Sequence, residues 1–254
     1  MRLWVDEGHG GADSGAVGGG KVEDARNLSL GEAVEAIARL QGWQVESTRE
    51  KDIFVTLQER YKDANAYHAD VFVSIHHDWI KGEQAVIFAN QHDVANSKRL
   101  ADHINRQIDP ILPNLPNGGI YGDRRGLAVL KGTNMPAVIV EASRVQDVYS
   151  VHAMADAIVK GICSYKGVPF RDSGVAPKPP APKPKPVPPT LKFGSRGEWV
   201  TKLQGVLNSR SGSNLKRDGI FGSLTYNAVR NYQHNHGLVV DGIVGPKTWG
   251  HLGY

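Results

Sequence analysis

The chain has 254 residues, of which 40% are hydrophobic, and 30 Lys and Arg stand against 26 Asp and Glu. This length allows one sizeable hydrophobic core and a smaller companion domain. No apolar run approaches the roughly 20 residues of a membrane-spanning helix, so we expect no membrane insertion. The single cysteine, Cys163, excludes an internal disulfide framework.

Charge is unevenly distributed along the chain. Residues 1–172 carry 19 Lys and Arg against 23 Asp and Glu, whereas residues 173–254 carry 11 against 3. A basic C-terminal part suggests contact with an anionic surface, although the same bias can serve solubility alone. Its basic residues are scattered and no base-reading motif accompanies them, so we expect no nucleic-acid binding.

The N-terminal part alternates between short runs rich in β-branched residues and longer helical patterns. Strands are predicted at residues 2–5, 43–48, 71–77, 85–89, 127–131 and 137–142. Helices are predicted at residues 28–40, 57–67, 97–107 and 148–162. This alternation predicts an α/β fold with a mixed or mostly parallel sheet flanked by helices.

A proline-rich segment follows this alternation. Residues 173–190 contain eight prolines and three lysines, a composition that favours polyproline II at about 3.1 Å per residue. We interpret the segment as a semi-rigid linker between a catalytic domain, 1–172, and a C-terminal domain, 191–254. A ligand for SH3-type domains is the alternative.

The C-terminal domain contains an internal repeat. The sequence DGIFG at 218–222 recurs as DGIVG at 241–245, and each copy is followed by a Thr. Helical patterns at residues 198–208, 224–236 and 246–252 predict a small three-helix domain.

Four residues have the chemistry of a metal-dependent hydrolase: His9, Glu23, His76 and Glu141. Three of them, His9, His76 and Glu141, lie at or just past the end of a predicted strand, where sites of α/β sheets form. Imidazole and carboxylate groups bind zinc, and a set of three, here His9, Glu23 and His76, leaves a fourth position for water. Glu141 can then move protons. The sequence therefore predicts metal-assisted hydrolysis, although the long spacing is a weak signal by itself.

Several stretches together carry a resemblance to a known family. They are DEGHGGADSGA (6–16), VEDARNLSL (22–30), GWQVESTREKD (42–52), LQERYKDANAYHADVFVSIHHD (57–78) and RRGLAVLKGTNMPAVIVEA (124–142). Through them residues 2–165 resemble zinc-dependent N-acetylmuramoyl-L-alanine amidases of the third amidase family, which have a zinc exopeptidase-like fold. The resemblance implies that His9, Glu23 and His76 bind Zn²⁺ and that Glu141 is the catalytic base and acid. It also implies that a zinc-activated water cleaves the amide between N-acetylmuramic acid and L-alanine of peptidoglycan.

Two features depart from the pattern of that family. Residues 142–147 replace its usual Gly-Phe pair and Asn, and Asp78 stands where the family usually has Asn. The Asp78 carboxylate could support a metal ligand or change the charge of the site. Arg124 and Arg125 are candidates for binding a carboxylate of the stem peptide, with solvated or salt-bridged arginines as the alternative.

Residues 193–252 resemble the small peptidoglycan-binding domain that accompanies many cell-wall hydrolases. Phe221, Tyr232 and Trp249 are candidates for stacking on sugar rings, although aromatic residues at helical spacing are more often part of a core. Five further histidines are expected to be solvated and outside any site: His68, His77, His234, His236 and His251.

This modular organisation resembles a phage endolysin that binds peptidoglycan as a monomer. Because the first motif begins at Asp6, we expect no signal peptide, synthesis in the cytoplasm and access to the wall through a membrane lesion. Three alternatives stay open: a bacterial autolysin, a zinc peptidase that cuts the stem peptide, and a non-catalytic wall-binding protein.

Overall fold

The computed structural model describes residues 1–77, 83–89, 91–172 and 188–252. The chain divides into two compact units, Met1–Ala181 and Pro182–Tyr254. Most of the predicted linker lies outside the described residues, so its conformation and its limits stay a prediction. Among the described helices, none has the length and apolar character that crossing a bilayer requires.

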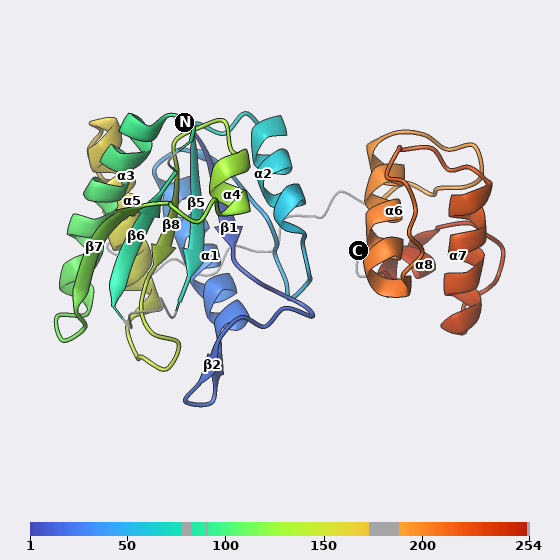
Figure 1. The fold of residues 1–254 in the computed structure, drawn as a ribbon, viewed down its shortest axis with the longest axis horizontal. Helices are drawn as coiled ribbons and strands as arrows, with labels where there is room; N and C mark the ends of the chain where they lie inside the picture. Colours follow the sequence, from blue (N-terminus) through green and yellow to red (C-terminus); the bar gives the residue numbers. More distant parts are fainter. Residues whose placement is uncertain (78–82, 90, 173–187, 253–254) are drawn as a thin grey trace. The chain divides into compact units, whose positions relative to one another are not determined.

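A six-stranded sheet forms the centre of the described N-terminal unit, in the order β4-β1-β5-β8-β6-β7 (Figure 1). Its strands are β1 (Arg2–Glu7), β4 (Gln44–Ser47), β5 (Val71–His76), β6 (Gln84–Phe88), β7 (Asn117–Gly122) and β8 (Ala137–Glu141). The first four strands in the sheet order, β4, β1, β5 and β8, are parallel, whereas β6 is antiparallel to β8 and parallel to β7. The predicted mixed α/β sheet is confirmed.

Helices cover both faces of this sheet (Figure 1). They are α1 (Glu23–Leu40), α2 (Leu57–Ala66), α3 (Val94–Ile108), α4 (Ala128–Gly132) and α5 (Val151–Lys166), with a short 3₁₀ turn η1 at Asp109–Ile111. Helices α1, α3 and α5 pack together on one face, and α2 and α4 on the other. Strand β1 shows why two cores form: Leu3 and Val5 join the first hydrophobic cluster, whereas Trp4 between them joins the second.

One predicted strand is a helix in the structure. The sequence predicts a strand at residues 127–131, but residues 128–131 belong to helix α4 and Leu127 directly precedes it. The carboxylate of Asp123 accepts hydrogen bonds from the backbone N–H groups of Arg125 and Leu127, which turns the chain into the helix. Val129 and Leu130 are then buried in the second cluster. A short apolar run does not distinguish a buried strand from a buried helical turn by periodicity alone.

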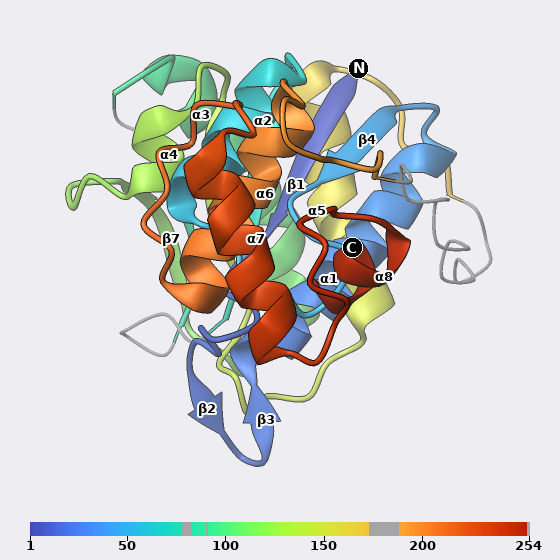
Figure 2. The same cartoon turned by 90° about the vertical axis from the view of Figure 1, so that its right-hand side faces the viewer.

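Three strands lacked a clear sequence signal. Strand β7 begins with Asn and two glycines, a composition typical of turns. Strands β2 (Val17–Gly18) and β3 (Lys21–Val22) have two residues each and form an antiparallel hairpin. This hairpin projects from the edge of the unit at which β1, β5 and β8 end (Figures 1 and 2).

The C-terminal unit contains the three predicted helices, α6 (Glu198–Ser211), α7 (Ser223–Asn235) and α8 (Pro246–His251). Its repeat is organised by two buried glutamines. The Gln204 amide nitrogen donates to Asp218 Oδ1 (2.9 Å) and Thr225 Oγ1 (3.1 Å), and its oxygen accepts from the Gly219 N–H (3.0 Å). One side chain therefore holds a whole DGI turn against a helix.

Gln233 repeats this arrangement in the second copy. Its amide nitrogen donates to Asp241 Oδ1 (2.9 Å) and Thr248 Oγ1 (3.3 Å), while its oxygen accepts from the Gly242 N–H (2.9 Å). The repeat is therefore present in the structure as well as in the sequence, because polar groups of each DGI turn form hydrogen bonds with one buried glutamine.

The three aromatic residues considered for sugar stacking belong to the core of this unit. Phe221, Tyr232 and Trp249 are 1%, 2% and 1% exposed and pack in one hydrophobic cluster. A ring that stacks on a sugar must present a face to solvent, which none of these rings does. The structure therefore corrects the anchoring role and supports the alternative interpretation as core residues.

Candidate metal and catalytic site

The site forms where three neighbouring parallel strands end. Strands β1, β5 and β8 are adjacent in the sheet, so their carboxyl ends meet at one edge. His76 is the last residue of β5, Glu141 is the last residue of β8, and the two are paired in register. His9 follows β1 by two residues, and Glu23 is the first residue of α1. A helix N-terminus favours the negative charge of Glu23.

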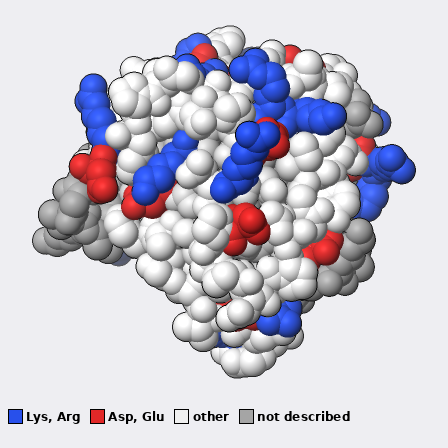
Figure 3. All heavy atoms as spheres, turned by 90° about the vertical axis from the view of Figure 1, so that its left-hand side faces the viewer, with Lys and Arg blue, Asp and Glu red and all other residues white. Residues whose placement is uncertain are grey.

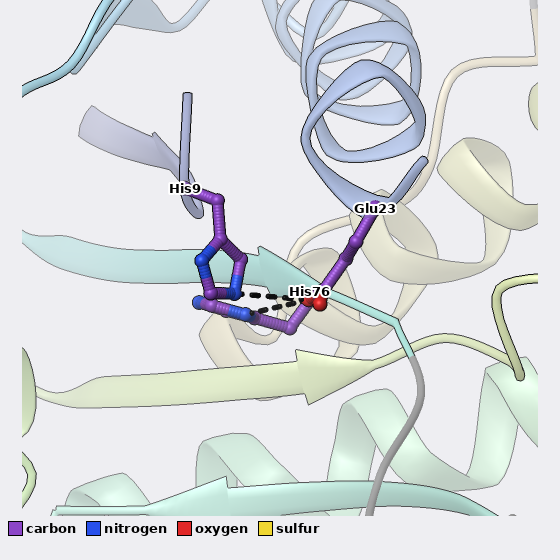
Figure 4. Close-up of side chains that lie close together, drawn as sticks. All are labelled: His9, Glu23 and His76. Atoms are coloured by element: carbon purple, nitrogen blue, oxygen red, sulfur yellow. Dashed lines mark hydrogen bonds and ion pairs between the residues drawn. The ribbon is translucent and has the colours of Figure 1, made fainter. Parts of the chain in front are cut away.

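Two imidazoles converge on one carboxylate (Figure 4). Glu23 Oε1 lies 3.3 Å from His9 Nε2 and 3.0 Å from His76 Nδ1. The potential ligand atoms of the three residues all lie within 4.8 Å of one another. The structure thus brings together the three predicted metal ligands from three separate elements.

The His9 backbone is held in an unusual conformation. Its φ angle is 62°, in the left-handed region that residues with side chains seldom adopt. The Arg60 guanidinium stabilises this turn because it donates to the His9 carbonyl (2.8 Å), the Glu7 carbonyl (2.7 Å) and the Asp6 carboxylate (2.8 Å). On the imidazole, Asp13 Oδ2 lies 2.9 Å from Nδ1, which directs Nε2 toward Glu23.

Two glycines leave room for the ligand side chains. A Cβ atom at Gly8 would lie 2.3 Å from the His76 ring, and one at Gly15 would lie 2.6 Å from Glu23 Oε2 and 2.7 Å from the His9 ring. Any side chain at these positions would displace a ligand. The glycines around His9 therefore serve close packing as well as turning of the chain.

The charges of the three residues support one another. The hydrogen bond and the negative charge of Glu23, together with Asp13, raise the pKa of His9 to about 9 although burial opposes this. Burial would raise the pKa of Glu23, but hydrogen bonds from His76 and His9 hold it well below its usual range. Glu23 is therefore a carboxylate at every physiological pH, as a metal ligand must be.

Glu141 has the opposite electrostatic setting. It is 8% exposed, and its Oε2 atom has no hydrogen-bond partner among the described residues. Burial raises its pKa to about 7, against the opposing positive charges of His76 and Arg125. A buried carboxyl group that exchanges its proton near neutral pH suits a general base or acid.

The donor set fits zinc. Two imidazole nitrogens and one carboxylate oxygen match the ligands of catalytic zinc sites, which keep a further position for water or substrate. Glu141 is paired in register with the ligand candidate His76, and its unpartnered Oε2 atom is available as a base. The arrangement is therefore suited to hydrolysis of a polarised carbonyl compound.

The other predicted site residues have different outcomes. Arg124 and Arg125 are exposed in the loop before α4, and the charge of Arg125 acts on Glu141. Asp78 lies outside the described residues. Binding of a substrate carboxylate by the two arginines, and any role of Asp78, stay predictions.

The segment that departs from the family pattern is firmly anchored at the site. Lys21 of the β2–β3 hairpin donates to the carbonyls of Gln146 (3.1 Å) and Asp147 (2.8 Å). Arg26 of α1 donates to the carbonyls of Val145 (2.5 Å) and Asp147 (2.6 Å). Two cations thus fix the loop that follows Glu141.

His77 was expected to be solvated, but it is 2% exposed. Its ring lies against Asn27 and Tyr149, and burial together with the positive charge of Arg26 lowers its pKa to about 3. The available sequence signal was its position directly after a buried strand, which makes a solvated side chain improbable. The pattern gives no indication of its partners, because Asn27 and Tyr149 are distant in the chain.

Charge on the face that carries β7 and α3 is mixed (Figure 3). Basic and acidic side chains are interspersed there. Helix α3 carries one pair of opposite charges, Arg106 with Asp102. The described residues of this face therefore offer no extended surface of one sign.

Family models match both units of the chain. Residues 3–164 match the model of N-acetylmuramoyl-L-alanine amidase, and residues 196–252 match that of a peptidoglycan binding domain. The uncharacterized protein YqiI of Bacillus subtilis is 34% identical over 64% of this chain and 84% of its own length. The amidase LytC of the same species is 30% identical over 62% of this chain but only 32% of its own length.

A phage protein and a solved structure are similarly related. The endolysin of Bacillus phage SPP1 is 30% identical over 69% of this chain and 70% of its own length. The structure of the amidase AmiC2 of Nostoc punctiforme is 31% identical, with a TM-score of 0.58 over 66% of this chain and 97% of that one. The sheet, the helices and the sequence stretches around the site therefore point to one family.

Proposed function

Because the chain belongs to the N-acetylmuramoyl-L-alanine amidase family, we propose that it hydrolyses the amide between N-acetylmuramic acid and L-alanine of peptidoglycan with Zn²⁺ as cofactor. One observation carries the proposal: the potential ligand atoms of His9, Glu23 and His76 all lie within 4.8 Å of one another. The buried carboxyl group of Glu141 at the end of the neighbouring strand supports it.

Each residue has a defined task in this proposal. Zinc bound by His9, Glu23 and His76 would acidify a water molecule and polarise the amide carbonyl. Glu141 accepts the proton of the attacking water and later donates it to the leaving amine nitrogen. A pKa of about 7 suits both transfers, since neither protonation state is strongly disfavoured near neutral pH.

The C-terminal unit holds the enzyme on its polymer in this proposal. Its match to a peptidoglycan binding domain supports this role. A binding unit joined to a catalytic unit raises the local concentration of an insoluble substrate, even when its own affinity is weak. We propose that the enzyme acts as a monomer, because all residues of the proposed site come from one chain.

The test identifies the bond that is cut. Purified peptidoglycan is digested with zinc-loaded wild-type protein and with the Glu141→Gln variant, and the new chain ends are identified by mass spectrometry. We expect free stem peptides that begin with L-alanine beside glycan without peptide. The variant keeps the size of the side chain but loses the base, so its rate should fall by roughly 10²- to 10⁴-fold.

Two outcomes would contradict the proposal. New ends inside the stem peptide would show a zinc peptidase, which could use the same four residues. Full activity of Glu141→Gln would remove Glu141 from the mechanism. Zinc content of the variant is the control, because an intact metal site shows that the loss of rate comes from the missing base.

We assign the enzyme the role of a phage endolysin that is made in the cytoplasm and reaches the wall through a membrane lesion. The relationship to the endolysin of phage SPP1 over 70% of that protein supports this role. A bacterial autolysin stays the alternative, because an amidase of a bacterium, LytC of Bacillus subtilis, is related as well. Expression in a susceptible host separates the two: an endolysin lyses the culture only after the membrane is permeabilised, whereas an exported autolysin is found outside intact cells.

A further inference from the structure

His77 lies beside the metal ligands but faces away from them. Its backbone N–H donates to Glu23 Oε1 (3.2 Å), so its main chain touches a ligand. Its ring fills a buried position between two polar side chains, with Nδ1 2.7 Å from Asn27 Oδ1 and Nε2 2.6 Å from the Tyr149 hydroxyl. Both ring nitrogens therefore take part in short hydrogen bonds.

Asn27 determines which nitrogen of the ring carries the proton. Its amide nitrogen donates to the Gly8 carbonyl (3.0 Å) and lies 3.5 Å from Glu23 Oε1. The Gly8 carbonyl and the Glu23 carboxylate can only accept, so the Asn27 amide group turns its nitrogen to them and its oxygen to His77, from which the oxygen accepts. It follows that Nδ1 of His77 donates and Nε2 accepts.

Tyr149 is suited to donate to that acceptor. With the proton of the ring on Nδ1, the Nε2 atom can only accept, so the Tyr149 hydroxyl 2.6 Å away donates to it. The Arg26 guanidinium lies 4.9 Å from the centre of the Tyr149 ring. Since Arg26 donates to the carbonyls of Val145 and Asp147 as well, Tyr149 and this loop are held by the same cation.

These contacts form one continuous path from the loop after Glu141 to the ligand Glu23. We propose that His77 is a positioning residue: as a neutral imidazole with its proton on Nδ1, held between Asn27 and Tyr149, it fixes the orientation of Glu23 for the metal. This inference rests on the proposed metal site. Partners of metal ligands in such positions typically change metal affinity or activity by about 10- to 100-fold when they are lost.

The first test reads the proton directly. Protein labelled with ¹⁵N in histidine is studied by long-range ¹H–¹⁵N NMR, without zinc and with zinc, and His77→Gln identifies the signals of His77 by their absence. We expect the pattern of a neutral ring protonated at Nδ1 in both forms. A ring protonated at Nε2, or at both nitrogens, would overturn the inference whether or not the enzyme is active.

The second test removes one hydrogen bond. Tyr149→Phe deletes the hydroxyl that Nε2 of His77 needs, so the ring is free to change tautomer and the Asn27 amide is free to rotate away from Gly8. We expect roughly tenfold weaker zinc binding in competition with a chelator and a lower kcat, with KM little changed. Thermal unfolding of the metal-free variant monitors any general loss of stability.

Tyr165→Phe is the matched control. Tyr165 also lies beside a histidine, His103, with ring centres 6.3 Å apart, but on α5 away from the ligands. The Tyr165→Phe variant also loses one tyrosine hydroxyl, but it should keep the zinc affinity and the kcat of the wild type. Equal zinc affinity of wild type and Tyr149→Phe would overturn the inference and leave the proposed function standing. Wild-type protein that binds no zinc would overturn both.

Discussion

His9 combines a strained backbone with the proton that a metal must displace. The left-handed φ angle of 62° is maintained because Arg60 binds the His9 carbonyl. Glu23 and Asp13 meanwhile favour the charged imidazolium in the metal-free site. Only the neutral ring binds a metal, so the same carboxylates that orient His9 make metal binding compete with protons.

Zinc affinity of the metal-free protein is expected to rise with pH up to about 9. The pKa of His9 is raised to about 9, chiefly through its hydrogen bond to Glu23, so below this pH a proton must leave before zinc binds. Competition with this one proton weakens the apparent affinity by up to about tenfold for each pH unit below 9. Chelator competition between about pH 6 and 9 measures this dependence.

Asp13→Asn is the control for this pH dependence. Asp13 contributes to the raised pKa of His9 by a hydrogen bond and by its charge, so the variant should shift the dependence to lower pH. A zinc affinity that does not change with pH in the wild type would contradict His9 as a ligand.

At this scale the sequence was sufficient to single out the residues that converge in the structure, but insufficient for the side chains that hold them. His9, Glu23, His76 and Glu141 were predicted because each lies in a motif or at a strand end, and the structure brings the first three together. His77 was missed because its role depends on contacts with residues 50 and 72 positions away. Contacts of that separation have no local pattern.

The position of α2 relative to β1 depends on one buried cation. Arg60 is 3% exposed and pairs with Asp6, which is 1% exposed, across 2.8 Å. Burial would raise the pKa of Asp6, but the charge of Arg60 and hydrogen bonds from Ser74 and Thr48 hold it below its usual range. Removal of Arg60 therefore leaves a buried charge without its partner.

Arg60→Met is expected to lower the free energy of unfolding by about 3 kcal/mol or more. The methionine keeps much of the apolar stem, so the loss comes mainly from the unpaired Asp6 and from the released His9 turn. Urea denaturation of the metal-free protein measures it. Arg106→Met is the matched control, since Arg106 is 72% exposed in its pair with Asp102 and should cost about 1 kcal/mol or less. Similar losses in both variants would contradict the argument.

Strands with several consecutive apolar residues were predictable, whereas helix α4 and the β2–β3 hairpin were not. Strands β1, β5 and β8 are buried runs and were placed to within a few residues. Helix α4 has only five residues, and its start depends on the carboxylate of Asp123. The β2–β3 hairpin has two residues in each strand and is fixed by Lys21 binding to a loop 125 residues away.

At the scale of the whole molecule, each unit has a core of its own. The two clusters of the N-terminal unit draw on residues from 1 to 170, and the cluster of the C-terminal unit draws on residues from 191 to 252. The C-terminal turns are further held by Gln204 and Gln233 within the same unit. None of these clusters includes a described residue of the other unit. The domain limits that the change of composition suggests stay a prediction.

A protein of residues 1–172 is expected to cleave a soluble muropeptide with unchanged kcat but to lose binding to insoluble peptidoglycan. Loss of the tether lowers the local substrate concentration, so the rate on intact cell walls should fall roughly a hundredfold or more. Co-sedimentation with purified walls measures binding, and residues 191–254 alone should sediment without cleaving. If the shortened protein lost cleavage of the soluble substrate as well, the C-terminal unit would have to act on the catalytic unit itself. The separate cores argue against such an effect, because the contacts described above for His9, Glu23, His76 and Glu141 all come from residues of the N-terminal unit.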